Sequence, residues 1–86
     1  MGVLDSEHAF QRAFGLRLRL RRTCLGLTQA EFAANAGMSA TFIGQIERGD
    51  HGVNIRHLPR LARAARSTVA DLMPDGATPA GRVLSD

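Results

Sequence analysis

Small and polar side chains recur along residues 39–48 in a pattern that suits hydrogen bonding to the edges of stacked bases. At helical spacing, Ile43 and Ile46 share one face of this segment. A helix that enters the major groove of DNA needs a small, polar outer face, because bulky apolar side chains would block contact with the bases. Thr and Gln can donate or accept there, and Ala can contact a thymine methyl group. The residues on the outer face are Ala40, Thr41, Gly44, Gln45 and Arg48.

The charge of the chain is compatible with the same chemistry. The 86 residues include eleven basic ones, all Arg, against eight acidic ones, which gives a formal net charge of +3. Arg suits phosphate and guanine because its planar group presents several donors as a fork. Arg82 is the single basic residue in residues 67–86, so the positive charge is concentrated in residues 1–66. Proteins that bind no nucleic acid also carry a net charge of this size, so this signal alone is weak.

Catalysis and metal binding find little support in the residues. His8, His51 and His57 have no i, i+4 pairing, and Cys24 has no second Cys at ligand spacing, so we expect no metal site. The sequence has no nucleophile motif, no phosphate-binding glycine loop and no acidic cluster for nuclease metals. We therefore expect no enzyme activity and no cofactor. With no apolar run near 20 residues and no secretory signal, we expect a cytoplasmic protein without membrane contact.

The segment 39–48 is expected to form the second of two helices that a short turn joins. The periodicity predicts a first helix from Asp5 to about Leu25, where the chain then turns at a glycine. Thr28 with Glu31 is typical of a capping box, and it opens a second helix over residues 29–36. Gly37 then ends this helix, and Ser39 begins the third helix two residues later. This is the spacing of a helix-turn-helix unit.

Two further helices are expected after the third. Asn54 is predicted to cap a fourth helix that carries Ile55, and Pro59 is expected near its fifth position, where it should kink or tighten the first turn. Thr68 is predicted to cap a short fifth helix that Pro74 ends. The fold class is therefore all-α, a compact five-helix bundle.

One domain accounts for the length of the chain. We expect an N-terminal extension over residues 1–8, a DNA-binding domain over 9–74 and a C-terminal tail over 75–86, in which Val83 and Leu84 could be an anchor.

The stretch LGLTQAEFAANAGMSATFIGQIERG, residues 25–49, resembles the helix-turn-helix of the large bacterial and phage repressor family that includes the lambda and 434 repressors and Cro-type proteins. Residues 54–73 are similar to the fourth and fifth helices of that family, so roughly two-thirds of the chain is covered. The resemblance implies the lambda-repressor-like fold, with the second and third helices forming the helix-turn-helix. The motifs that carry it are Leu27-Thr28-Gln29, Gly37-Met38-Ser39 and Ile46-Glu47-Arg48-Gly49.

The resemblance also implies which residues contact DNA. The base-reading positions of the family fall on Ser39, Ala40, Thr41 and Gln45. The family often has Gln at the position of Ala40, so specificity is expected to depend more on Thr41, Gln45 and DNA shape. Contacts to the DNA backbone are implied for Thr28, Gln29, Arg48 and Arg56, with the main-chain amides of Ile55 and Arg56.

Arg22 and Glu47 occupy the two positions that form an ion pair in the resembling repressors. The alternative is two unrelated surface charges, which the residues alone make equally plausible. The resemblance favours a structural pair that orients the third helix.

The function implied by the resemblance is a transcriptional regulator, a repressor or controller that binds a pseudo-palindromic double-stranded DNA operator as a homodimer. We expect apolar residues around the fifth helix, Val69, Leu72 and Met73, to form the dimer interface. The alternative is that Leu72 and Met73 complete the core of the monomer. RNA polymerase is a further candidate partner. Restriction-modification controllers, phage repressors and antitoxins all fit, and the sequence does not separate them. One alternative is an antitoxin or protein-interaction module with secondary DNA binding. Another is a helical nuclease or other enzyme, whose only support is that one fold can host many functions.

Overall fold

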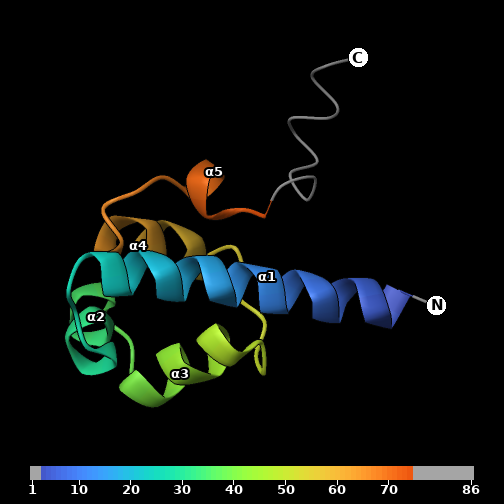
Figure 1. Ribbon diagram of the computed structural model, residues 1–86, viewed down its shortest axis with the longest axis horizontal. Coiled ribbons are helices and arrows are strands. Elements are labelled where there is room, and N and C mark those ends of the chain that lie inside the picture. Colours follow the sequence, from blue (N-terminus) through green and yellow to red (C-terminus); the bar gives the residue numbers. More distant parts are fainter. Residues whose placement is uncertain (1–2, 75–86) are drawn as a thin grey trace.

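The computed structural model describes residues 3–74, which form five helices (Figure 1). The all-helical fold predicted from the sequence is confirmed. The first helix starts before the expected Asp5 and takes in most of the expected N-terminal extension; Val83 and Leu84 lie outside the described residues. The helices are α1 (Val3–Cys24), α2 (Gln29–Ala36), α3 (Ala40–Arg48), α4 (His57–Ala64) and α5 (Val69–Leu72).

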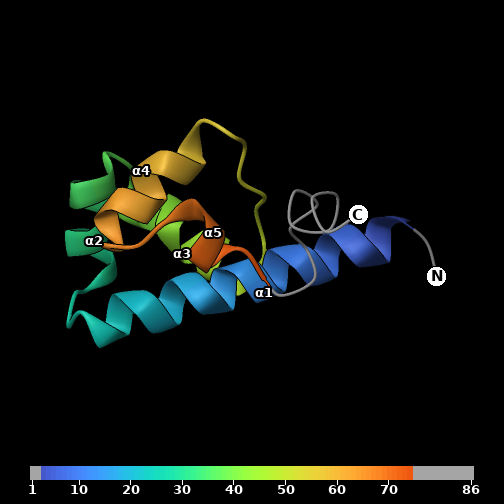
Figure 2. The same ribbon diagram turned by 90° about the horizontal axis from the view of Figure 1, so that it is seen from above.

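The long helix α1 organises the bundle. In Figure 1, α2 and α3 lie on one side of α1, and α4 and α5 lie on the other. Figure 2 shows the other four helices gathered along one flank of α1, so the opposite flank of this helix faces outward. α1 packs against α3 and α5, α2 packs against α3 and α4, and α4 packs against α5. Within residues 3–74, no helix combines the length and the apolarity needed to cross a bilayer.

The core lies where these helices meet. Its large side chains come from all five helices and are almost completely shielded from solvent, as expected when the apolar stripe of each helix faces the same centre. The largest fully buried residues are Phe14, Leu18, Phe32, Ile43, Ile46 and Leu61.

The start of α2, its end at Gly37 and the start of α3 follow the chemistry expected from the sequence. The Thr28 hydroxyl accepts a hydrogen bond from the Glu31 amide at 3.0 Å, and the Glu31 carboxylate accepts one from the Thr28 amide at 2.8 Å. Gly37 adopts a left-handed conformation, φ 70°, that favours glycine at the end of a helix. The Ser39 hydroxyl then accepts from the Phe42 amide at 3.0 Å. These caps satisfy amides at both helix starts and fix the angle of the turn.

Arg60 of α4 holds the same turn from outside. Its Nε donates to the Ala36 carbonyl oxygen at 3.1 Å, and its Nη2 donates to that of Gly37. A cation at the end of α2 also complements the partial negative charge of the helix C-terminus. Arg60 therefore connects α4 to the helix-turn-helix.

α1 and α3 cross with their backbones in close approach at Gly15. A Cβ atom at this position would lie 2.2 Å from the Ile46 carbonyl oxygen and 2.7 Å from that of Glu47. Only a residue without a side chain permits this spacing. The depth at which α3 sits against α1 therefore depends on Gly15.

The start of α4 differs from the expectation. The helix begins at His57, and the Asn54 side chain accepts from the amides of Arg56 at 3.0 Å and His57 at 3.3 Å in the turn before it. Pro59 is consequently the third residue of α4. Its missing N–H has no intrahelical partner in the first turn, so no helical hydrogen bond is lost at this position.

Candidate nucleic-acid interface

The outer face of α3 presents the residues that the sequence predicted as base readers. Ala40 and Thr41 are exposed and Gln45 is half-buried, whereas Ile43 and Ile46 on the inner face are 0% and 1% exposed. The two faces of α3 therefore have separate roles: one anchors the helix in the core, and the other offers small polar groups to a partner. Ser39 is also exposed at the start of this face, although its oxygen is engaged as the helix cap.

Gly44 is the one expected outer-face residue that lies beneath other side chains. It is buried, and a Cβ atom here would lie 3.3 Å from Nη1 of Arg48 and 3.6 Å from the amide group of Gln29. In this structure Gly44 provides room for two longer side chains. Arg48 and Gln29, rather than Gly44, form the outer surface at this point.

Glu47 connects three helices beneath this surface. Its carboxylate accepts from Arg22 of α1 through Nε at 2.6 Å and Nη2 at 3.1 Å, and from Gln29 of α2 at 3.0 Å. The side chains of Arg22 and Glu47 are only 11% and 3% exposed. Arg22 also donates to the Leu27 carbonyl oxygen at 2.7 Å. The paired and buried arrangement corresponds to the structural ion pair implied by the resemblance. It also includes Gln29, for which the resemblance implies only a contact to the DNA backbone.

The ion pair also shifts the pKa of Arg22. The hydrogen bond with Glu47 raises the pKa of Arg22, burial of the guanidinium opposes this, and the negative charge of the carboxylate adds to the increase. The net direction is upward. Arg22 therefore stays a cation throughout any working pH range.

Arg48 lies at the end of α3 with its charge open to solvent. Its Nε donates to the Asp50 carboxylate at 3.0 Å, and both side chains are more than half exposed. An exposed pair of this kind is weak and readily exchanged. The guanidinium can therefore turn toward another anion at little cost.

Arg56 is exposed beside the start of α4, as a backbone contact requires. Its main-chain amide, however, already donates to the Asn54 side chain. The expectation that this amide is free for a phosphate is wrong for this structure, because Asn54 caps the turn from three residues upstream of the helix.

An aromatic cluster beside α3 was not anticipated from the sequence. Phe42 meets the ring of His51 at a centroid distance of 4.8 Å and that of His57 at 5.1 Å, both edge-on. The cluster fixes the loop after α3 against α3 and the start of α4. Spacing along the chain gives no sign of this contact, because it is made through a loop.

The residues expected at a dimer interface are mostly part of the monomer core. Leu72 is 2% exposed, and Val69 and Met73 are partly buried against the same core. Leu72 cannot supply exposed interface area in this structure, because α5 folds it inward. Among residues 7–74, the exposed large apolar residues are instead Leu16 and Leu20 of α1 and Ile55.

Comparison with known sequences gives one family match. Residues 13–73 match the model of a family described as a helix-turn-helix domain. This range includes α2, α3 and all the residues of the outer face. A search of curated proteins gives no match.

Several solved structures are similar to this fold. The restriction-modification controller protein C.AhdI from Aeromonas hydrophila superposes with a TM-score of 0.73 at 34% identity, over 76% of this chain and 98% of that chain. The clp gene regulator ClgR from Corynebacterium glutamicum gives a TM-score of 0.70 at 30% identity, over 73% of this chain and 67% of that chain.

An enzyme also contains this fold. Hydroxypropylphosphonic acid epoxidase from S. wedmorenis gives a TM-score of 0.69 at 23% identity, and the match spans 74% of this chain but 34% of that chain. At this identity, and over a minor part of the enzyme, the likeness shows the fold alone.

Proposed function

The chain belongs to the helix-turn-helix domain family, and from this membership we propose that it is a sequence-specific transcription regulator that inserts α3 into the major groove of an operator. The observation that carries the proposal is the two-sided character of α3. Its inner face is anchored in the core by Ile43 and Ile46, while its outer face exposes Ala40 and Thr41. A rigidly held helix with small polar groups outward is the surface that major-groove reading requires.

Base recognition would rest on Thr41 and Gln45. Their side chains can donate and accept toward base edges, and Ala40 can contact a thymine methyl group. Ser39 keeps its hydroxyl hydrogen free to donate, because only its oxygen is used in the cap. With few long side chains on this face, the shape and deformability of the DNA would contribute part of the specificity.

The start of α2 would hold a phosphate. Thr28 takes up the Glu31 amide, which leaves the amides of Gln29 and Ala30 without an acceptor among the described residues. Free amides at a helix N-terminus attract an anion. Gln29 donates one amide hydrogen to Glu47 and has a second available. The phosphate contact would therefore be connected to the ion pair that positions α3.

Arg48 and Arg56 would contact the backbone on the other side of α3. Both are exposed, and the only partner that Arg48 has among the described residues is the exposed Asp50. Phosphate would replace this partner with a stronger charge-assisted bond. These contacts fix the position of the protein on DNA and do not select sequence.

A twofold dimer is the expected working unit, because one helix-turn-helix reads only a few base pairs. Two copies would place their α3 helices in successive major grooves about 34 Å apart, so the operator would be a pseudo-palindrome. The likeness to C.AhdI, a restriction-modification controller protein, favours a controller role for this cytoplasmic regulator. Contact with RNA polymerase would be one way for such a regulator to act.

Selection of bound sequences from a random pool of double-stranded DNA tests the proposal. We expect an enriched inverted repeat with half-site centres one helical turn apart, bound much more tightly than scrambled DNA. The same affinity for all sequences at every salt concentration would contradict sequence-specific regulation.

A further inference from the structure

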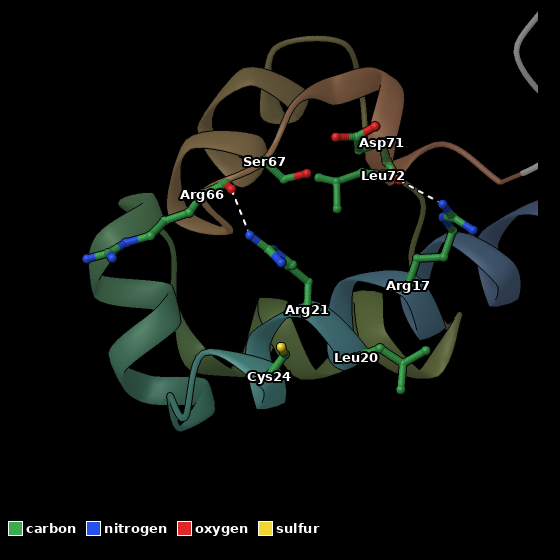
Figure 3. Close-up of a pocket in the computed structure, with 8 residues that line it drawn as sticks. All are labelled: Arg17, Leu20, Arg21, Cys24, Arg66, Ser67, Asp71 and Leu72. Carbon is green, nitrogen blue, oxygen red and sulfur yellow. Dashed lines mark hydrogen bonds between the residues drawn. The ribbon is translucent and has the colours of Figure 1, made fainter.

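A groove of about 500 Å³ runs between α1 and the segment that joins α4 to α5 (Figure 3). Its lining residues come from α1, from the joining segment and from α5. None of them belongs to α2 or α3, so an occupant of the groove leaves the outer face of α3 uncovered. Figure 3 shows Arg66 at one end of the groove and Arg17 at the other, with Arg21 between them.

Arg17 is only partly satisfied at its end of the groove. Its Nη2 donates to the Asp71 carbonyl oxygen at 2.9 Å. Its Nε is buried and makes no hydrogen bond within residues 3–74. Because buried donors in folded proteins almost always have an acceptor, this nitrogen points to an acceptor that a further segment supplies.

The other two arginines differ in how they are bonded. Arg21 donates through Nε to the Ala65 carbonyl oxygen at 2.8 Å and through Nη2 to that of Arg66 at 2.9 Å, so it holds the joining segment against α1. The Arg66 guanidinium is exposed and makes no side-chain hydrogen bond or salt bridge within residues 3–74. With three arginines and one carboxylate, that of Asp71, the lining favours an occupant with acidic groups.

The groove also borders apolar surface on α1. Leu16 and Leu20 are 53% and 58% exposed and lie one helical turn apart, so they share one side of the helix. Leu20 lines the groove itself. An occupant that satisfies the whole surface must therefore combine acidic groups with apolar side chains.

The C-terminal tail of the same chain, residues 75–86, has this composition. It carries one acidic residue at each end, Asp75 and Asp86, and an apolar pair, Val83 and Leu84, close to the second. The tail thus offers a carboxylate for each unsatisfied arginine and apolar side chains for the surface of α1.

The length of the tail also suits the groove. Pro74, the last described residue, comes shortly after Asp71, whose carbonyl oxygen is bonded to Arg17, so the tail starts from this end. Along α1 the lining extends from Arg17 to Cys24, which is about 10 Å of helix. Residues 76–82 can span at most about 25 Å when extended, which is more than the groove requires.

We propose that residues 75–86 occupy this groove and run along α1 from Arg17 toward Arg66. The first carboxylate of the tail supplies an acceptor at Arg17, and the last one pairs with Arg66. The apolar pair covers Leu20 and the neighbouring Leu16. Because the tail is attached, it meets the groove at an effective concentration of about millimolar, so even a weak affinity keeps it in place.

Docking of the tail goes beyond the proposed function and does not depend on it. It gives the anchor expected at Val83 and Leu84 a place on the domain. The surface proposed to bind DNA lies on α2, α3 and the start of α4, away from the groove. The tail therefore covers the apolar side of α1 while the reading helix stays accessible.

The reactivity of Cys24 in the full chain measures whether the groove is covered. Cys24 is the single cysteine of the sequence, lines the groove and is left exposed by residues 3–74. In the double variant Val83→Ser/Leu84→Ser, its reaction with a neutral maleimide is expected to be about tenfold faster than in the wild type, as for a tail docked about nine-tenths of the time. The matched control, Ala77→Ser/Ala80→Ser, adds the same hydroxyl groups outside the apolar pair and should keep the wild-type rate.

Charge reversal tests the pairing with Arg66. Arg66→Glu faces the Asp86 carboxylate with a like charge and is expected to speed the reaction of Cys24 about threefold. The new negative charge by itself would slow the reaction, because it disfavours the thiolate. Adding Asp86→Arg restores opposite charges and should return the rate toward the wild-type value.

The control for charge is Arg63→Glu, on an exposed arginine of α4 that does not line the groove, and it should leave the rate unchanged. Circular dichroism of every variant reports whether the helices are retained. A faster reaction with the helices intact then reports opening of the groove rather than unfolding.

Two results would overturn the proposal. Equal rates for the wild type and Val83→Ser/Leu84→Ser would show that the tail does not cover the groove. A wild-type rate that falls as the protein concentration rises would show that a second copy covers it instead of the attached tail. A chain whose tail protects Cys24 but which binds no operator would contradict the proposed function and leave the docked tail standing.

Discussion

Glu47 receives hydrogen bonds from Arg22 of α1 and Gln29 of α2, so a single carboxylate determines how α3 is held relative to both helices. The two charged side chains are almost fully shielded from solvent. The two charges must stay paired, because a buried charge that loses its partner destabilises the fold far more than the intact pair stabilises it.

We predict that Glu47→Ala lowers the free energy of unfolding by about 3–5 kcal/mol, because it strands the Arg22 guanidinium. Chemical denaturation measures this loss, with Asp50→Ala as the control, since Asp50 forms an exposed ion pair and should cost about 1 kcal/mol or less. A similar loss for both variants would show that the burial of the pair is unimportant. Because the pKa of Arg22 is raised in the folded protein, its contribution is complete below the ordinary Arg pKa and is lost only as pH rises through the higher folded value.

The exposed residues of α3 should behave differently from Glu47. We predict that Thr41→Ala and Gln45→Ala each weaken binding to the selected operator by about 1–3 kcal/mol, with relaxed preference at a defined base pair and unchanged stability. Competition binding on operator and scrambled DNA measures this difference. If Gln45→Ala changed neither affinity, α3 would not be the reading helix.

The position of α3 also depends on how closely α1 packs against it, and the two helices approach each other at Gly15. We predict that Gly15→Ala destabilises the protein by about 1–3 kcal/mol or more, because the new methyl group would overlap two backbone carbonyl oxygens that cannot turn aside. The better helix propensity of Ala, about 1 kcal/mol, offsets only part of this clash.

Thermal unfolding of Gly15→Ala can be compared with Gly44→Ala, a second glycine inside a helix. At Gly44 the nearest atoms belong to the ends of the flexible Arg48 and Gln29 side chains, so the loss should be small. Equal destabilisation of the two variants would contradict the assigned helix crossing.

The elements that the sequence predicted well are those set by local chemistry. The bounds of α2 and α3 follow from Thr28, Gly37 and Ser39, whose capping bonds form within three or four residues. The predicted start of α4 is too early, because the Asn54 side chain bonds the amides of Arg56 and His57 and the helix begins only at His57. Local patterns specify that a cap exists but leave the helix boundary open by one or two residues.

The features that the sequence did not predict depend on contacts between segments far apart in the chain. The role of Gly15 depends on the depth of a helix crossing, and the burial of Leu72 depends on the direction in which α5 turns. Neither has a signature in spacing along the chain. The Arg22–Glu47 pair was predictable only through family resemblance, because 25 residues separate its partners.

At the scale of the whole molecule, binding to DNA should depend strongly on salt. We predict that Arg48→Ala and Arg56→Ala each weaken binding to operator and scrambled DNA alike and reduce the slope of log affinity against log salt by about 1. Titrations at several salt concentrations measure the slope. The control is Arg63→Ala, on an exposed arginine outside the proposed contact surface, which should leave the slope unchanged.

Along α3 and its cap, the side-chain hydrogen bonds described within residues 3–74 come from Ser39, Glu47 and Arg48. Thr41 and Gln45, on the outer face, take no part in them. Of the positions that would choose the operator, Thr41 and Gln45 are thus chemically independent of those that keep the protein folded, whereas Ser39 also caps α3. A lineage carrying this scaffold could exchange its operator by substitutions at two or three surface positions, with little loss of stability on the way. The same independence makes α3 a practical site for transplanting the recognition residues of another regulator.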